Sequence, residues 1–231
     1  VVNSGSEQKR RHTGRKNMQR LLTATAICAL GAGAAFAECG TVTFSDVGWT
    51  DITATTAATS VVLDALGYET DTLVLSVPVT YTSLASGDVD IFLGNWMPTM
   101  EADIAPYRDA GTVDTVRANL TGAKYTLATN AAGAAMGIAD FADIAEAADA
   151  LDAQIYGIEP GNDGNRLILD MIAANAFGLG DAEFDVVESS EQGMLAQVAR
   201  ASDREEPIVF LGWEPHPMNA NFNLTYLTGG D

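Results

Sequence analysis

Three short apolar segments, each followed closely by a tryptophan, constrain the fold of this chain more than any other feature. The segments are 42–44, 89–93 and 208–211, and the tryptophans are Trp49, Trp96 and Trp213. Short apolar runs of this kind are typical of strands buried on both faces of a parallel sheet, and open α/β sheets bind ligands beyond the carboxyl ends of such strands. Core packing by itself gives no reason for all the tryptophans of a chain to occupy one kind of position. The pattern therefore predicts a ligand site assembled from strand ends.

Strand and helix patterns alternate along most of the chain, which predicts an α/β fold with helix-covered, mostly parallel sheets. In the first half, strands are expected at 42–44, 72–77 and 89–93, and helices at 51–66 and 81–85. In the second half, strands are expected at 123–129, 154–158, 184–187 and 208–211, and helices at 141–150, 165–177 and 191–201. The two sets predict a first lobe at 38–121 and a second lobe at 122–213, facing each other across a cleft, with residues 214–231 beginning a return to the first lobe.

The first 37 residues have the pattern of a secretory signal. Basic residues between Lys9 and Arg20 precede an apolar run at 21–36 that is too short to span a bilayer, and a cleavage site ends at Ala37. The pattern predicts an upstream extension before Met18, cleavage after Ala37 and a location in the periplasm. The alternative is a basic arm on a cytosolic protein.

The charge of the chain changes sign after this segment. Six of the 12 basic residues and one of the 31 acidic residues, Glu7, lie in residues 1–37, which leaves 6 basic against 30 acidic residues and a net charge of −24. A field of this sign repels nucleic acid and anionic lipid and attracts cations, so nucleic acid is not an expected partner. Adaptation to salty surroundings explains the same charge equally well.

The chain after residue 37 lacks the catalytic groups that several classes of enzyme need. His216 and Cys39 are the single histidine and the single cysteine there, so neither a histidine-rich metal site nor a supported Cys/His pair is expected. No nucleophile-elbow, Walker or dinucleotide-binding motif follows a strand, and no cofactor is expected. A pair of carboxylates for glycoside hydrolysis stays open, because acidic residues are abundant.

The remaining candidates are aromatic and neutral-polar side chains with one carboxylate. They are Trp49, Trp96, Tyr125 and Trp213, together with Asp51 and Asn162. Aromatic faces that converge with a carboxylate form a receptor for a quaternary ammonium, which has no N–H to donate and is held by ring quadrupoles and charge. Simpler roles are a core position for Tyr125, a helix N-cap for Asp51 and a turn or cap for Asn162.

Four blocks of this sequence, at 46–51, 86–98, 156–164 and 212–218, resemble the substrate-binding proteins of ABC transporters for choline and glycine betaine. The resemblance extends over residues 40–231. It implies a two-lobed, type II periplasmic-binding fold that closes on its ligand, a monomer without enzymatic activity, and an inner-membrane ABC permease as partner. It also implies that the four aromatic residues form the cage, with Asp51 as acidic partner and Asn162 as amide partner.

Within this family, the pair Asp51 and Asn162 favours choline, whose hydroxyl can donate to a carboxylate and accept from an amide. A betaine carboxylate needs donors, such as His216 or backbone N–H groups, so glycine betaine or proline betaine is the alternative ligand. A secreted hydrolase and an acidic interaction module that binds a cationic partner are alternatives from other classes. The lone Cys39 and the end of the chain at Asp231 predict a carboxyl-terminal truncation that removed a second cysteine. The resemblance implies that the missing segment is the carboxyl-terminal part of the first lobe.

Overall fold

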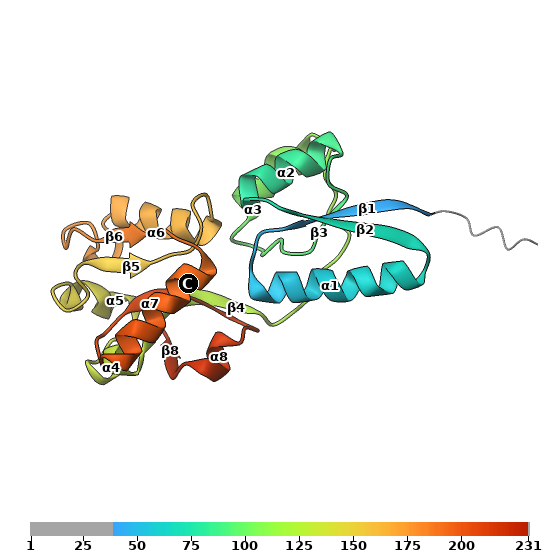
Figure 1. Cartoon of the computed structure of the whole chain (residues 1–231). Helices are drawn as coiled ribbons and strands as arrows, with labels where there is room; N and C mark the ends of the chain where they lie inside the picture. The colour runs from blue at the N-terminus through green and yellow to red at the C-terminus, as the bar shows by residue number, and fades with distance from the viewer. Residues whose placement is uncertain (1–38, 231) are drawn as a thin grey trace, which may run out of the picture. The chain divides into compact units, whose positions relative to one another are not determined.

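The computed structural model describes residues 39–230, which form two β-sheets with helices packed against them (Figure 1). The predicted signal sequence and its cleavage site, residues 1–37, lie outside the described residues. No helix within residues 39–230 combines the length and the apolar character that crossing a bilayer requires. The α/β class predicted from the sequence is confirmed, because helices connect the strands of both sheets.

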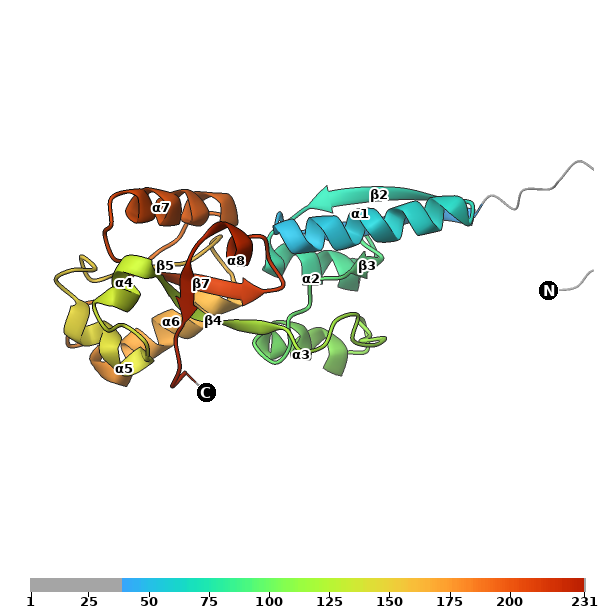
Figure 2. The same cartoon turned by 90° about the horizontal axis from the view of Figure 1, so that it is seen from below.

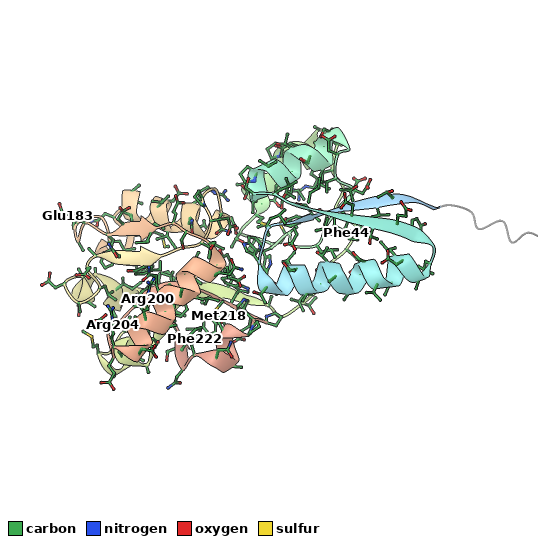
Figure 3. The ribbon with its side chains drawn as sticks, in the orientation of Figure 1. Phe44, Glu183, Arg200, Arg204, Met218 and Phe222 are labelled. Carbon is green, nitrogen blue, oxygen red and sulfur yellow. The ribbon has the colours of Figure 1, made fainter. Side chains whose placement is uncertain are left out.

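The first sheet contains three parallel strands in the order β2-β1-β3. Its elements are β1 (Cys39–Asp46), α1 (Thr50–Ala65), β2 (Tyr68–Val74), α2 (Val77–Ser86), β3 (Ile91–Phe92) and α3 (Glu101–Asp109). Parallel neighbours need crossover connections, which α1 and α2 provide. In Figure 1, α1 lies on one side of this sheet and α2 with α3 on the other. Phe44 of β1 is completely buried in this part of the molecule (Figure 3).

The second sheet has five strands in the order β6-β5-β7-β4-β8. These are β4 (Lys124–Asn130), β5 (Gln154–Tyr156), β6 (Asp185–Val187), β7 (Val209–Glu214) and β8 (Leu224–Tyr226). The strands β5, β6 and β7 are parallel, whereas β4 runs antiparallel to both β7 and β8. The buried strand β7 is therefore central, with a parallel neighbour on one side and an antiparallel neighbour on the other.

Five α-helices and two short 3-10 helices accompany the second sheet. The α-helices are α4 (Ala131–Ala135), α5 (Phe141–Ile144), α6 (Asp163–Ala173), α7 (Glu191–Asp203) and α8 (Met218–Asn221), and the 3-10 helices are η1 (Ala145–Ala147) and η2 (Ala176–Gly178). Figure 2 shows α7 on one side of the sheet and α5 with α6 on the other. Met218, the first residue of α8, and Phe222, which follows its last residue, are labelled in Figure 3, and Met218 is buried in the core.

The structure differs from the sequence-based predictions in several elements. The helices α3, α4 and α8 and the strand β8 were not predicted, and the helix expected at 141–150 is reduced to α5 and a 3-10 turn. Residues 214–231 were expected to begin a return to the first lobe. Instead, β8 pairs with β4 and extends the second sheet, because its backbone groups complete the open edge of that strand.

Candidate ligand-binding site

Four aromatic side chains that the sequence singled out line one cavity. Trp49, Trp96, Tyr125 and Trp213 surround it, and we call these four residues the aromatic cage. The ring centroids of Trp96 and Tyr125 are 5.9 Å apart, and those of Tyr125 and Trp213 are 6.2 Å apart at an interplanar angle of 82°. Ile158 and Asp163 complete the lining. Residues that are up to 164 positions apart in the sequence thus meet at one point.

The cage is assembled from the ends of strands in both sheets. Trp49 follows β1 at the start of α1, and Trp96 lies in the loop after β3. Trp213 was expected after a strand, but it lies within β7, next to the last residue. Tyr125 lies near the start of β4, directly opposite Trp213 in the register. An antiparallel β4 brings its amino end to the carboxyl end of β7, and this pairing places the two rings side by side.

The polar atoms of three cage residues are bonded to acceptors outside the cavity lining. The indole N–H of Trp49 donates to both carboxylate oxygens of Glu159, at 3.1 and 3.0 Å. The indole N–H of Trp213 donates to Asp51 Oδ1 at 3.3 Å. The Tyr125 hydroxyl donates to Asn162 Oδ1 at 3.0 Å, and burial raises the pKa of this hydroxyl well above its ordinary value. These bonds hold the three rings through partners that lie outside the cavity lining.

Asp51 supports the cage from behind in this structure. It lies in the first turn of α1, but the N-cap position belongs to Trp49, so the simpler role as an N-cap is wrong. Its carboxylate holds Trp213 and borders a neighbouring hollow that also contains Trp96, and it does not line the cage cavity. Burial raises the pKa of Asp51, although the hydrogen bond from Trp213 opposes this shift.

Asn162 caps helix α6. Its Oδ1 accepts from the backbone N–H groups of Gly164 at 2.8 Å and Asn165 at 3.3 Å, in addition to the Tyr125 hydroxyl. The side chain is buried, and these bonds give it the role of a helix cap, which is one of the simpler roles expected from the turn sequence. A residue with these bonds fixes both the start of α6 and the position of the tyrosine ring.

Gly164 is required by the close approach of Tyr125 to the start of α6. A Cβ atom at this position would lie 2.0 Å from the Tyr125 hydroxyl oxygen and 3.0 Å from Asn162 Oδ1. A distance of 2.0 Å does not occur between non-bonded atoms, so a side chain here forces the Tyr125 hydroxyl to move. The glycine in the Asn-Asp-Gly turn therefore serves the site as well as the turn.

Asp163 and Glu159 are residues of this region that the sequence analysis did not single out. Asp163 lines the cavity and is only 1% exposed, and its Oδ1 accepts from Asn162 Nδ2 at 3.2 Å. Glu159 holds Trp49 from outside the lining. Both lie in the block at 156–164, but an acidic residue at the start of a helix has an ordinary electrostatic role, so nothing in the sequence set Asp163 apart.

His216, the candidate donor to a betaine carboxylate, does not line the cavity. Its Nδ1 accepts from the backbone N–H of Met218 at 2.9 Å. Its Nε2 lies 3.1 Å from Glu191 Oε1, which is close enough for an ion pair although the two groups are not aligned for a hydrogen bond. The imidazole is buried among these partners, so it is not placed to donate to a ligand in the cage.

Hydrogen bonds join segments of the two sheets on either side of the cage. Glu191 of α7 accepts from the backbone N–H of Thr50 at 2.8 Å and from its hydroxyl. Arg166 of α6 forms a two-pronged ion pair with Asp103 of α3, with N–O distances of 2.8 and 2.9 Å. Two-pronged pairs of this kind are geometrically specific, so they help to hold the cage residues of both sheets together.

The space inside the cage is narrow. The cavity has a volume of about 10 Å³, which is room for about one water. The rings of Trp96, Tyr125 and Trp213 therefore lie close to one another, with little free space between them. Among residues 39–230, no cluster of three or more His, Cys, Asp or Glu side chains is arranged to hold a metal ion.

Known proteins similar to this chain share its fold. The family model for the substrate-binding domain of the ABC-type glycine betaine transport system matches residues 40–231. A solved ABC-transporter choline-binding protein in complex with choline is 74% identical over 84% of this chain and 66% of that chain, with a TM-score of 0.81. An ABC-transporter choline-binding protein in an unliganded, semi-closed conformation is 73% identical over 83% and 66%, with a TM-score of 0.76.

A more distant solved structure is the lactococcal OpuAC in its closed, liganded conformation with glycine betaine. It is 25% identical over 82% of this chain and 71% of that chain, with a TM-score of 0.72. The chain thus spans about two thirds of the length of the solved proteins it matches, 66% for each of the choline-binding structures. These similarities confirm the two-lobed α/β fold expected from the sequence. The chain belongs to the family of substrate-binding domains of ABC-type glycine betaine transport systems.

Proposed function

We propose that this protein is a non-enzymatic periplasmic receptor that binds choline in the aromatic cage and delivers it to an inner-membrane ABC permease. The observation that carries the proposal is the meeting of four aromatic rings around a cavity that also contains the Asp163 carboxylate. The protein acts as a monomer in this proposal, with a first lobe at 38–121 and a second lobe from residue 122. Choline is also the ligand of the solved relative at 74% identity.

The cage suits a quaternary ammonium for energetic reasons. Such a cation has no N–H group, so it gains nothing from acceptors and is attracted by the negative faces of aromatic rings. A desolvated ring contributes about 1–2 kcal/mol. Four rings and a carboxylate therefore reach about −8 kcal/mol, the binding free energy of a micromolar ligand.

Choline is favoured over a betaine by the charges around the cage. Asp163 lines the cavity and Asp51 lies behind Trp213, so a ligand carboxylate would be repelled by one acidic side chain in the lining and by a second one behind it. His216, the side chain considered as its donor, is committed to Met218 and Glu191. Glycine betaine or proline betaine remains the alternative ligand, as glycine betaine is bound by the relative at 25% identity.

A secreted hydrolase is a weaker candidate, because an acid–base pair needs two carboxylates that face one substrate. Asp163 is the single acidic residue among those that line the cage cavity.

An interaction module that binds a cationic partner through its acidic surface is distinguished by the salt dependence of its affinity. Screening weakens interactions between surface charges, and it affects a ligand in a desolvated cage far less.

Calorimetry with choline, glycine betaine, proline and lysine tests the proposed function. We expect choline to bind with micromolar affinity and more tightly than glycine betaine, and proline and lysine not to bind measurably, because they lack the trimethylammonium group. The titration is repeated at high salt, where the affinity for choline should change little. If neither choline nor a betaine binds more tightly than about millimolar, about −4 kcal/mol, the proposed function is wrong.

Replacing Asp51 with asparagine tests the role of this carboxylate in ligand choice. Asparagine retains an acceptor for the Trp213 indole N–H but removes the negative charge behind the ring. We therefore expect choline affinity to fall by about three- to tenfold and glycine betaine affinity to fall less, because the betaine carboxylate no longer meets an anion. Calorimetry of both ligands measures the ratio. Asp149→Asn, an exposed change of equal charge, is the control. If Asp51→Asn leaves the ratio of choline affinity to glycine betaine affinity unchanged, Asp51 only holds Trp213 in place and has no role in ligand choice.

A further inference from the structure

Asp163 is distinguished from the other acidic residues around the cage by a carboxylate oxygen that is both buried and without a hydrogen-bond partner. Both oxygens of Glu159 receive the Trp49 N–H, and Asp51 receives the Trp213 N–H. Glu191 receives the backbone and side chain of Thr50. By contrast, Asp163 Oδ2 is buried and has no hydrogen-bond partner within the described residues. Buried carboxylate oxygens normally have partners, so this one requires an explanation.

The neighbouring donors of Asp163, Arg166 and Thr99, are engaged elsewhere. The guanidinium of Arg166 is paired with Asp103 and also donates to the carbonyl oxygen of Thr99. The Thr99 hydroxyl, which lies near Asp163, donates to the carbonyl oxygen of Trp96 at 3.0 Å. Within residues 39–230, Asp163 forms no ion pair. Burial raises the pKa of Asp163, and the interactions with Thr99 and Arg166 oppose this shift.

The position of Asp163 at the start of α6 does not by itself explain its burial. An acidic residue in the first turn of a helix is favourable because of the helix dipole, but this benefit is available with the carboxylate in water. Here the side chain is instead enclosed with four aromatic rings and Ile158. Burial without a counter-charge is unfavourable, so a structural role alone leaves the arrangement unexplained.

We propose that Asp163 is a specificity-determining residue whose carboxylate supplies the counter-charge for the quaternary ammonium of the ligand. A trimethylammonium group has no N–H to donate, so it suits a carboxylate that lines a cavity walled by aromatic rings and that has an oxygen without a donor. Its charge compensates the carboxylate, and the rings enclose its methyl groups. The cage thereby favours a cation over a neutral molecule of the same shape. This inference rests on the proposed function and adds to it the residue that makes the site selective for a cationic ligand.

The test compares choline with its neutral isostere 3,3-dimethylbutan-1-ol, in which a carbon atom replaces the nitrogen. Both ligands are titrated by calorimetry into the wild type, Asp163→Asn and the exposed control Asp149→Asn, with the isostere also measured by competition against choline. We expect Asp163→Asn to lower the affinity for choline tenfold or more. A cation at about 4–6 Å from a carboxylate changes the ionisation equilibrium of that carboxylate by a factor of ten or more, and choline binding gains from the same attraction. The affinity of Asp163→Asn for the isostere should stay within twofold of the wild type, and the control should change neither.

Thermal unfolding without ligand separates this role from a structural one. Removal of an uncompensated buried charge should leave the melting temperature of Asp163→Asn equal to or above that of the wild type. Asp163→Ser, which also removes the charge and suits a helix start, should show the same pattern of affinities. Equal losses for choline and the isostere, or no loss for either, would overturn the inference while leaving choline binding by the wild type in place. A wild type that binds neither choline nor a betaine would overturn the proposed function and this inference with it.

Discussion

Replacing Trp213 with alanine is expected to lower the free energy of unfolding by about 3–5 kcal/mol, because it empties a large buried volume in the central strand of the second sheet. The side chain is 3% exposed, and its ring packs against Tyr125 and, at a centroid distance of 4.9 Å, against His216. Its loss also removes the donor to Asp51. The same variant should bind choline about a hundredfold more weakly, since a wall of the cage is lost and Tyr125 loses its neighbour.

Urea unfolding and calorimetry on the same preparations measure both effects. Trp213→Phe is the matched control, because it keeps an aromatic face and most of the buried volume but lacks the indole N–H. It should lose about 1.5–3 kcal/mol of stability, the contribution of a hydrogen bond to a charged group, and retain most of the affinity. A Trp213→Ala protein that unfolds like the wild type would contradict the central packing of this ring.

Replacing Trp96 with alanine is expected to cause a large loss of choline affinity and, unlike Trp213→Ala, only a small loss of stability. Trp96 is partly exposed and lies in the loop after β3, so its truncation removes less buried surface than that of Trp213. Choline affinity should fall by about ten- to a hundredfold, about 1–3 kcal/mol, through the loss of a cation–π face and of contact with the methyl groups. The free energy of unfolding should fall by less than about 2 kcal/mol.

The neighbouring Met97→Ala is the control for changes in this loop, because Met97 is 47% exposed and does not line the cage. Calorimetry with choline and urea unfolding are again the two measurements. Should Trp96→Ala lose about 3–5 kcal/mol of stability and keep its affinity for choline, Trp96 is a core residue and the cage has three rings.

The sequence was sufficient to predict the parts of this protein that depend on short stretches of chain. Apolar segments closed by glycine or asparagine marked the ends of β1 and β3, and these ends place Trp49 and Trp96. The alternation of helix and strand patterns predicted the α/β class, and the positions of the three tryptophans and Tyr125 beside or in strands predicted the four aromatic residues of the cage. Where the local pattern was weak, as in the alanine-rich segment 131–137 or the short strand β8, elements were missed.

Only the tertiary structure decided which side chains face the cavity. Whether β4 runs parallel or antiparallel depends on its pairing with β7, which lies about 85 residues away, and no local pattern encodes that direction. The antiparallel pairing sets Tyr125 opposite Trp213. Likewise, Asp51 and Asp163 each follow the start of a helix in the sequence, and nothing local distinguishes them. Packing turns Asp51 to the back of Trp213 and encloses Asp163 in the cage, because burial and hydrogen-bond partners are set by contacts between segments that are distant in the chain.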